Sequence, residues 1–253
     1  MATKPAPRAA AIGTSLRLYH GDAVRLDRMA AFYRAFVPEG GLAFDVGAHV
    51  GDRARVFRRL GARVVGVEPQ PDVRRALRLV VRLVMAGDPG VVLEGAALGR
   101  GEGRMLLRIN ATNPTVSTLS DAFVAAAQGA EGWLGQVWSD DVEVPVTTLD
   151  ALIARHGVPD FIKIDVEGFE DVVLSGLSHP VAALSFEVTT IHRGPGLRAL
   201  EQLEGLGDYR FALSLGESFA LDTGWERASD MRARLEALPH AANSGDVYAR
   251  LQS

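Results

Sequence analysis

Five acidic residues stand at the end of short apolar runs in this 253-residue chain: Asp45, Glu68, Glu94, Asp165 and Glu187. Such runs, each followed by an acid or a glycine turn, are typical of buried parallel strands. In open α/β sheets, ligands bind outside the carboxyl ends of the strands. These acids are therefore the first candidates for ligand binding and proton transfer.

The first of these strands leads into a glycine-containing turn, Asp45-Val-Gly-Ala-His-Val-Gly51. Gly47 and Gly51 would let the backbone approach a ligand closely, and the N-terminus of the next helix would favour an anionic group. A dinucleotide-binding turn needs a central glycine to pass a pyrophosphate, but His49 occupies that place. The turn thus argues against NAD or FAD. It is adequate for S-adenosylmethionine, which carries no phosphate.

Glu68 follows the second strand at a spacing that suits a nucleoside, roughly 20 residues after the glycine turn. An acid there can accept hydrogen bonds from both ribose hydroxyls. The alternative is a solvated carboxylate at a strand end, before the turn that Pro69 predicts. Asp45 also has two interpretations: it either binds loop amides and holds the turn, or faces the ammonium group of the cofactor.

Lys163 precedes Asp165 by two residues, so both side chains project to the same face of a strand. A lysine buried in an apolar strand needs a polar partner. The pair is therefore either a structural ion pair that fixes the loop or the source of a catalytic group. Both residues are kept as catalytic candidates.

Glu187 ends a later strand, and His192 follows it in Val188-Thr-Thr-Ile-His192. These two residues and Asp165 could converge as a general base or as oxygen and nitrogen ligands of a metal. No compact metal-ligand spacing is present, so no metal site is assigned and a metal requirement is left open. We assign the role of general acid or base to Asp165 or Glu187. His192 is either part of this group or an ordinary surface or hydrogen-bonded histidine.

The arrangement of elements predicts an α/β fold: a Rossmann-like, doubly wound, mostly parallel sheet with helices on both faces. Helices are expected at 52–60, 72–85, 149–156, 168–176 and 197–206. Strands are expected at 42–46, 63–68, 91–95, 104–110, 141–146, 161–165, 182–187, 209–215 and 246–251, the last two as an antiparallel pair at the sheet edge.

A single domain over residues 16–253 is expected, preceded by a flexible tail over 1–15. Residues 111–140 form an expected insertion, within which 121–139 is either a helical lid or a surface excursion. The segment 73–85 is the most apolar helix-like run, but four arginines interrupt it, so no membrane span is expected.

The composition excludes several classes of function. A net charge of −4 gives no electrostatic reason to expect nucleic acid or an anionic membrane as a partner, so a small-molecule or glycan acceptor fits better. Cysteine is absent, which excludes disulfides, thiolate metal sites and a cysteine nucleophile. Cytoplasm is the default location, and the oligomeric state is left open.

Several motifs together resemble the FkbM family of methyltransferases. They occur in the family's order and spacing over residues 42–190: Phe44-Asp-Val-Gly-Ala-His-Val-Gly-Asp52, Gly66-Val-Glu-Pro69, Ala96-Ala-Leu-Gly99, Val146-Thr-Thr-Leu-Asp150, Phe161-Ile-Lys-Ile-Asp-Val-Glu-Gly-Phe-Glu170 and Leu174-Ser-Gly176. His49 departs from the asparagine usual in the family's first motif.

The resemblance implies a class I methyltransferase fold with S-adenosylmethionine as cofactor. It also implies O-methylation of a hydroxyl on a sugar, glycan or natural product. The cofactor would contact Asp45, Gly47, His49, Gly51, Glu68 and Ala96. The polar loop with Thr112, Ser117 and Thr118 resembles a hydroxyl-rich loop of the family, and would contact cofactor or acceptor if it is more than an ordinary loop.

Two other functions remain open at this stage. Fold alone does not establish activity, so the chain could be a catalytically silent module that binds a cofactor or a partner, with His49 in its favour. A nucleotide-dependent oxidoreductase would share the architecture, but the missing central glycine disfavours it.

Overall fold

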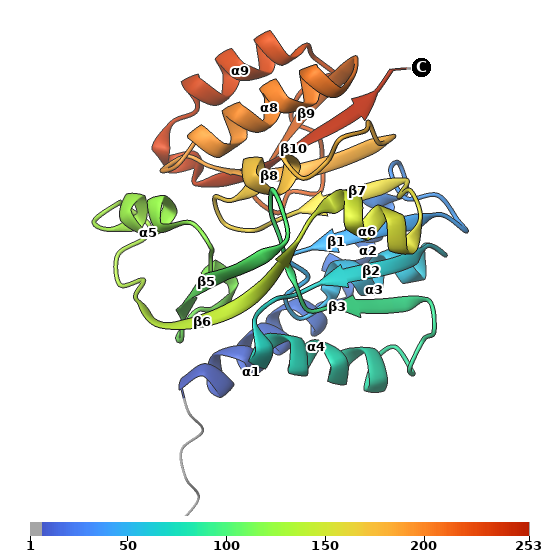
Figure 1. The fold of residues 1–253 in the computed structure, drawn as a ribbon, viewed down its shortest axis with the longest axis vertical. Helices are drawn as coiled ribbons and strands as arrows, with labels where there is room; N and C mark the ends of the chain where they lie inside the picture. The colour runs from blue at the N-terminus through green and yellow to red at the C-terminus, as the bar shows by residue number, and fades with distance from the viewer. Residues whose placement is uncertain (1–6, 253) are drawn as a thin grey trace, which may run out of the picture.

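The computed structural model describes residues 7–252, which form one α/β unit around a seven-stranded sheet (Figure 1). Each strand of the sheet pairs parallel with its neighbour except β10, which is antiparallel to both β8 and β9. This is the predicted mostly parallel sheet. The strands lie in the order β3 (Val91–Glu94), β2 (Arg63–Val67), β1 (Leu42–Val46), β7 (Phe161–Ile164), β8 (Ala183–Thr189), β10 (Ser244–Leu251) and β9 (Tyr209–Leu215).

Helices cover both faces of this sheet, so its central strands are buried on both sides. Alternate residues of β1 enter different clusters: Phe44 and Val46 pack in one core, and Ala43 in the other. The larger core includes residues of α6 (Leu149–His156), α7 (Glu170–Leu174), α8 (Gly194–Leu206) and α9 (Ala228–Ala237). The smaller core includes residues of α2 (Ala23–Tyr33) and α3 (Asp52–Arg59). The predicted doubly wound arrangement is confirmed.

A second, three-stranded sheet has the order β4 (Ala97–Leu98), β6 (Trp138–Thr147) and β5 (Gly103–Asn110). The segment between β5 and β6 holds a short 3₁₀ turn (Pro114–Val116) and α5 (Asp121–Ala127). Its apolar side chains form a small core of their own, around Val116, Phe123 and Trp133. The part of the chain expected as an insertion is therefore a packed element, and its last three residues belong to β6.

The N-terminal region differs from the expected tail. Residues 7–15 lie within α1 (Pro7–His20), and Ile12 and Leu16 pack against Val73 and Ala76 of α4 (Pro71–Leu83). The rest of the expected tail, residues 1–6, lies outside the described residues. Within 7–252, no helix has both the length and the apolar character needed to cross a bilayer.

Candidate active site

Two adjoining cavities lie where the carboxyl ends of β1, β2, β7 and β8 meet. The smaller encloses about 590 Å³ and the larger about 1130 Å³, open solvent at their mouths included. Both are lined by Gly47, His49, Thr115, Asp165 and Glu167, so they form one continuous site. The sheet edge predicted to bind a ligand is therefore hollowed.

The glycines of the first turn are required by packing within the chain. Both have positive φ, 81° at Gly47 and 84° at Gly51. A Cβ on Gly47 would stand 1.8 Å from the carbonyl oxygen of Asp165, and one on Gly51 would stand 2.4 Å from Cδ1 of Leu77. Gly47 lines both cavities and Gly51 lines neither. Gly51 thus serves the packing of α3 on α4, and its contact with a cofactor stays a prediction.

His49 connects this turn to the second strand. Its φ is 46°, a left-handed conformation in which His and Asn are enriched among non-glycine residues, so histidine can stand where relatives have asparagine. Its backbone N–H donates to Oε2 of Glu68 at 3.0 Å. Burial lowers the pKa of the imidazole to about 4, and its Nε2 is buried without a partner. His49 therefore offers a neutral polar group to both cavities.

Glu68 lines the smaller cavity and is only 7% exposed. Oε1 accepts the backbone N–H of Gln70 at 2.7 Å, while Oε2 accepts that of His49. Each oxygen keeps a second lone pair, so the carboxylate, fixed in position, can still accept two ligand hydroxyls. Burial raises its pKa to about 7. Gln70, 3% exposed, adds an unpartnered Nε2 in the same cavity wall.

Asp45 and Ala96 lie beside the site without lining either cavity. Asp45 is 1% exposed, its Oδ2 has no hydrogen-bond partner, and burial raises its pKa to about 7. Ala97 and Leu98 contribute to the smaller cavity where Ala96 was expected to do so. Glu94, the remaining strand-end acid, is paired with Arg155 and His156 and lines neither cavity.

Lys163 is completely buried at the centre of an ion triad. Its Nζ lies 2.7 Å from Oδ1 of Asp246 and 3.3 Å from Oδ2 of Asp165. Burial lowers the pKa of Lys163, but the two carboxylates outweigh it and raise the pKa above its ordinary value. The amine stays protonated and cannot accept a proton. Among the two interpretations of the pair, this geometry favours the ion pair that positions Asp165.

Asp246 is a residue that the sequence analysis missed. It lies opposite Glu187 in the antiparallel register of β10 and β8. The only signal for it was the position of an acid inside a closing strand, and that strand could not be placed beside β8 from the sequence.

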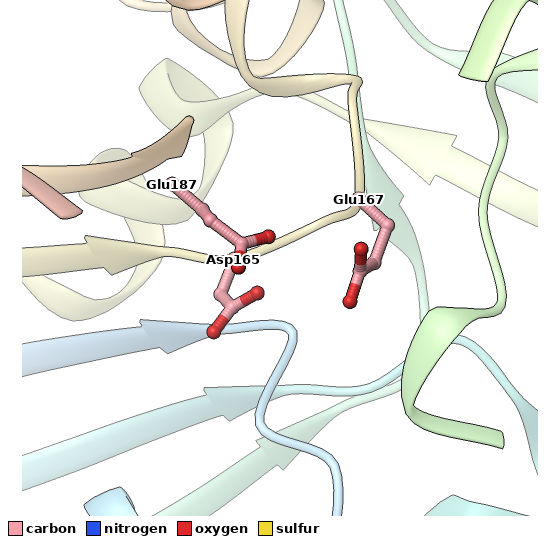
Figure 2. A group of neighbouring side chains, drawn as sticks. All are labelled: Asp165, Glu167 and Glu187. Atoms are coloured by element: carbon pink, nitrogen blue, oxygen red, sulfur yellow. The ribbon is translucent and has the colours of Figure 1, made fainter. Parts of the chain in front are cut away.

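Three carboxyl groups of the larger cavity's lining gather together: Asp165, Glu167 and Glu187 (Figure 2). They each offer an oxygen within 4.8 Å of the others. Burial raises the pKa of Asp165, but Lys163 and Arg53 outweigh it and leave the pKa below its usual value. Burial and the neighbouring carboxyl groups raise the pKa values of Glu167 and Glu187 well above the ordinary range. One member of the cluster is therefore ionised and two tend to hold protons.

His192 does not join this cluster or line either cavity. Its ring lies against Phe123 of α5, with centroids 6.4 Å apart. The turn after β8 is held by Thr190, whose Oγ1 donates to the carbonyl groups of His240 and Asn243. The expected convergence of His192 with Asp165 and Glu187 is wrong, because this turn leads the histidine to the insertion.

A family model for the FkbM methyltransferase domain matches residues 45–235, well over half of the chain. The chain belongs to the FkbM methyltransferase family. The search of the curated proteins found no match to it.

A solved methyltransferase structure shows the same fold as this FkbM chain. A methyltransferase FkbM from Methylobacillus flagellatus KT is 16% identical with a TM-score of 0.50, over 83% of this chain and 43% of that one. The present chain thus spans less than half of that protein. A precorrin-6Y C5,15-methyltransferase from Geobacter metallireducens GS-15 is 14% identical with a TM-score of 0.45, over 91% of this chain and 86% of that one.

The insertion of the FkbM chain forms one wall of the site. Thr118 donates its hydroxyl to the carbonyl of Glu167 at 2.7 Å, and Nε1 of Trp133 donates to Oδ1 of Asn243 at 3.2 Å. Ser117 and Thr118 line the smaller cavity, and Trp133 lines the larger. Trp133 had no sequence signal beyond being an aromatic residue in an unmatched segment. Thr112 lines neither cavity.

Proposed function

We propose that this FkbM protein transfers the methyl group of S-adenosylmethionine to a hydroxyl group of a small-molecule acceptor, of the sugar, glycan or natural-product class. The observation that carries the proposal is Glu68: a buried carboxylate, oriented by two backbone N–H groups and facing a cavity. Such a group suits the two hydroxyls of a ribose. Its neighbours His49 and Gln70 add unpartnered polar nitrogens beside it.

The residues present fit an adenosyl compound in the smaller cavity. Glu68 would bind the ribose, while Ala97, Leu98 and Phe169 supply apolar walls for an adenine ring. Asp165 and Glu167 lie at the junction with the larger cavity, which leaves that cavity for the rest of the cofactor and for the acceptor. When bound, the cofactor supplies an electrophilic methyl group, and the chain must align the acceptor and remove its proton.

Glu187 is the residue we assign to proton removal. Burial, and after it the neighbouring Glu167 and Asp165, raise the pKa of Glu187 well above its ordinary value, so its ionised form accepts a proton more readily than an unperturbed carboxylate does. Asp165, held ionised by Lys163, keeps the pKa of Glu187 high. Lys163 acts only through Asp165.

The charge of the larger cavity supports a neutral or cationic acceptor. Its lining is rich in carboxyl groups, namely Asp52, Asp165, Glu167, Glu187, Glu217 and Asp246. These groups would repel a phosphate backbone, so nucleic acid is disfavoured as an acceptor. A cytoplasmic location stays a prediction.

The test is methyl transfer from radiolabelled S-adenosylmethionine to panels of sugars, glycans and polyketides. Once an acceptor is found, Glu187→Gln should remove the acidic limb of the pH–kcat profile. Asp165→Asn should move that limb to lower pH, because it removes a charge that raises the pKa of Glu187. An unchanged profile in both variants would refute the assignment of the base.

Two controls separate the alternatives. Activity that survives EDTA supports proton transfer by the carboxyl cluster, whereas strict dependence on Mg²⁺ would make the cluster a cation site. Cofactor binding without methylation of any acceptor would favour the silent module. His49 no longer favours the hypothesis of an inactive binding module, because the histidine adopts the left-handed conformation and its backbone N–H donates to Glu68.

A further inference from the structure

The two cavities contain one strongly basic side chain among their described lining residues, Arg53 in the first turn of α3. The same wall carries six carboxyl groups. Lys163 is committed to two of them in its own ion triad. Arg53 is therefore the only lining arginine or lysine that could meet an anionic group of a ligand.

Carboxylates surround the guanidinium of Arg53, but none of them forms a close hydrogen bond with it. Its Nη atoms lie 3.8 Å from Asp52, 3.9 Å from Asp165 and 3.5 Å from Glu217, longer than charge-assisted hydrogen bonds. Its Nε is buried with no hydrogen-bond partner. By contrast, nearby Arg25 makes close bonds to two of the same acids, 2.8 Å to Asp52 and 2.6 Å to Glu217.

An ionised guanidinium with unsatisfied donors is costly unless a ligand completes its bonds. Its planar fork matches a carboxylate, which it can bind through two parallel hydrogen bonds. Arg53 also adjoins the Gly47–His49 turn, which lines both cavities. A ligand that begins at Glu68 in the smaller cavity and passes this turn would bring its other end to Arg53.

We propose that Arg53 binds the α-carboxylate of the methionine portion of the cofactor, an inference that rests on the proposed function. The ammonium and sulfonium groups would then face the carboxyl groups around Asp165. The positively charged groups of the cofactor would then lie among carboxyl groups, and its only negatively charged group would contact Arg53. Glu167 and Glu187 would be left on the acceptor side.

The experiment compares S-adenosylhomocysteine with its decarboxylated analogue, S-adenosyl-3-thiopropylamine, by calorimetric titration of the full chain. The two compounds differ only in the carboxylate. Wild-type protein should prefer S-adenosylhomocysteine by a factor of about 10 to 100, the range for hydrogen bonds to charged groups. Arg53→Met should lose most of this preference, and Arg53→Lys, which keeps the charge but not the fork, should retain part of it.

Arg25→Met is the matched control. Like the Arg53 variant, it removes an arginine near Asp52 and Glu217, but Arg25 lines neither cavity. It should keep the wild-type preference. If Arg53→Met does not fold, the wild-type preference and Arg53→Lys decide the question. A wild type that binds both compounds equally, or an Arg53 variant with full preference, overturns the proposal. Failure of wild type to bind either compound would instead reject the proposed function.

Discussion

Replacement of Lys163 by methionine tests the ion triad that positions the candidate base. Methionine fills a similar volume but leaves Asp165 and Asp246 without their buried cation. At an effective dielectric of ~20, the direct attractions at 2.7 and 3.3 Å amount to ~6 and ~5 kcal/mol. Desolvation of the three ions offsets most of this gain, so the net loss on removing one partner should be about 3–5 kcal/mol.

Urea unfolding at pH 7 measures this loss. With a slope of about 3 kcal/mol per molar, the midpoint of Lys163→Met should fall by about 1 to 1.7 M. Arg59→Met is the control, because Arg59 and Asp27 form an exposed pair, with side chains 58% and 63% exposed. Its free energy of unfolding should change by no more than about 1 kcal/mol.

The pH dependence follows from the two pKa shifts. The lowered pKa of Asp165 gives stability that is present above its unfolded pKa of about 3.9 and is lost as the pH falls through the folded value. The raised pKa of Lys163 gives stability that is complete below about pH 10.4 and is lost only as the pH rises through the folded value. The difference between wild type and variant should therefore be largest from about pH 7 to 9 and shrink towards pH 3, where the carboxyl groups left without their cation are protonated. A loss below about 1 kcal/mol at pH 7, or an equal loss at pH 3, would refute the triad as an energetic unit.

Three further variants test the walls of the site. Gly47→Ala should lose more than about 3 kcal/mol of unfolding free energy, because its Cβ overlaps the Asp165 carbonyl and its φ is positive; a soluble variant of wild-type Tm would contradict this. His49→Asn should keep wild-type stability and cofactor affinity, whereas β-branched His49→Val should cost about 1–2 kcal/mol by urea unfolding, and equal stability of the two would show that the left-handed turn imposes no constraint. Trp133→Ala should raise the KM for the acceptor while the dissociation constant of S-adenosylhomocysteine stays unchanged, and the reverse pattern would place the tryptophan on the cofactor.

The central fold could be predicted because its signals are local. The runs around Phe44, Val65 and Ile162 are apolar on both faces, which only buried parallel strands require. The same acids that end these runs, Glu68 and Asp165, lie at the cavities for the same reason. Strand ends in such a sheet converge whatever the details of packing.

The rest depended on long-range contacts that the sequence does not encode locally. Helix α1 contains Gly13 and a weak apolar stripe, and it packs through Ile12 and Leu16 on a helix about 60 residues away, which a local pattern does not reveal. His192 was misplaced because its direction depends on the bonds of Thr190 to the chain near Asn243. Arg53 is one of four arginines in α3, and no local pattern sets it apart from the other three.

Gly51 shows that a glycine can be required for a reason that the sequence does not reveal. The sequence pattern attributes the glycine at this position to the close approach of a ligand. In the structure, Leu77 of α4 leaves no room for a Cβ there. A pattern of glycines indicates that another group lies close to the backbone, but not whether that group belongs to a ligand or to the chain itself.

The most direct test of the account is calorimetric titration of the purified chain with S-adenosylhomocysteine, with NAD as the comparison and Glu68→Ala as the variant. Wild-type protein should bind S-adenosylhomocysteine saturably and should not bind NAD, and a correctly folded Glu68→Ala protein should lose affinity by about 10-fold or more. No binding by wild type, or full affinity in the variant, would contradict the assignment of this cavity to the adenosyl cofactor.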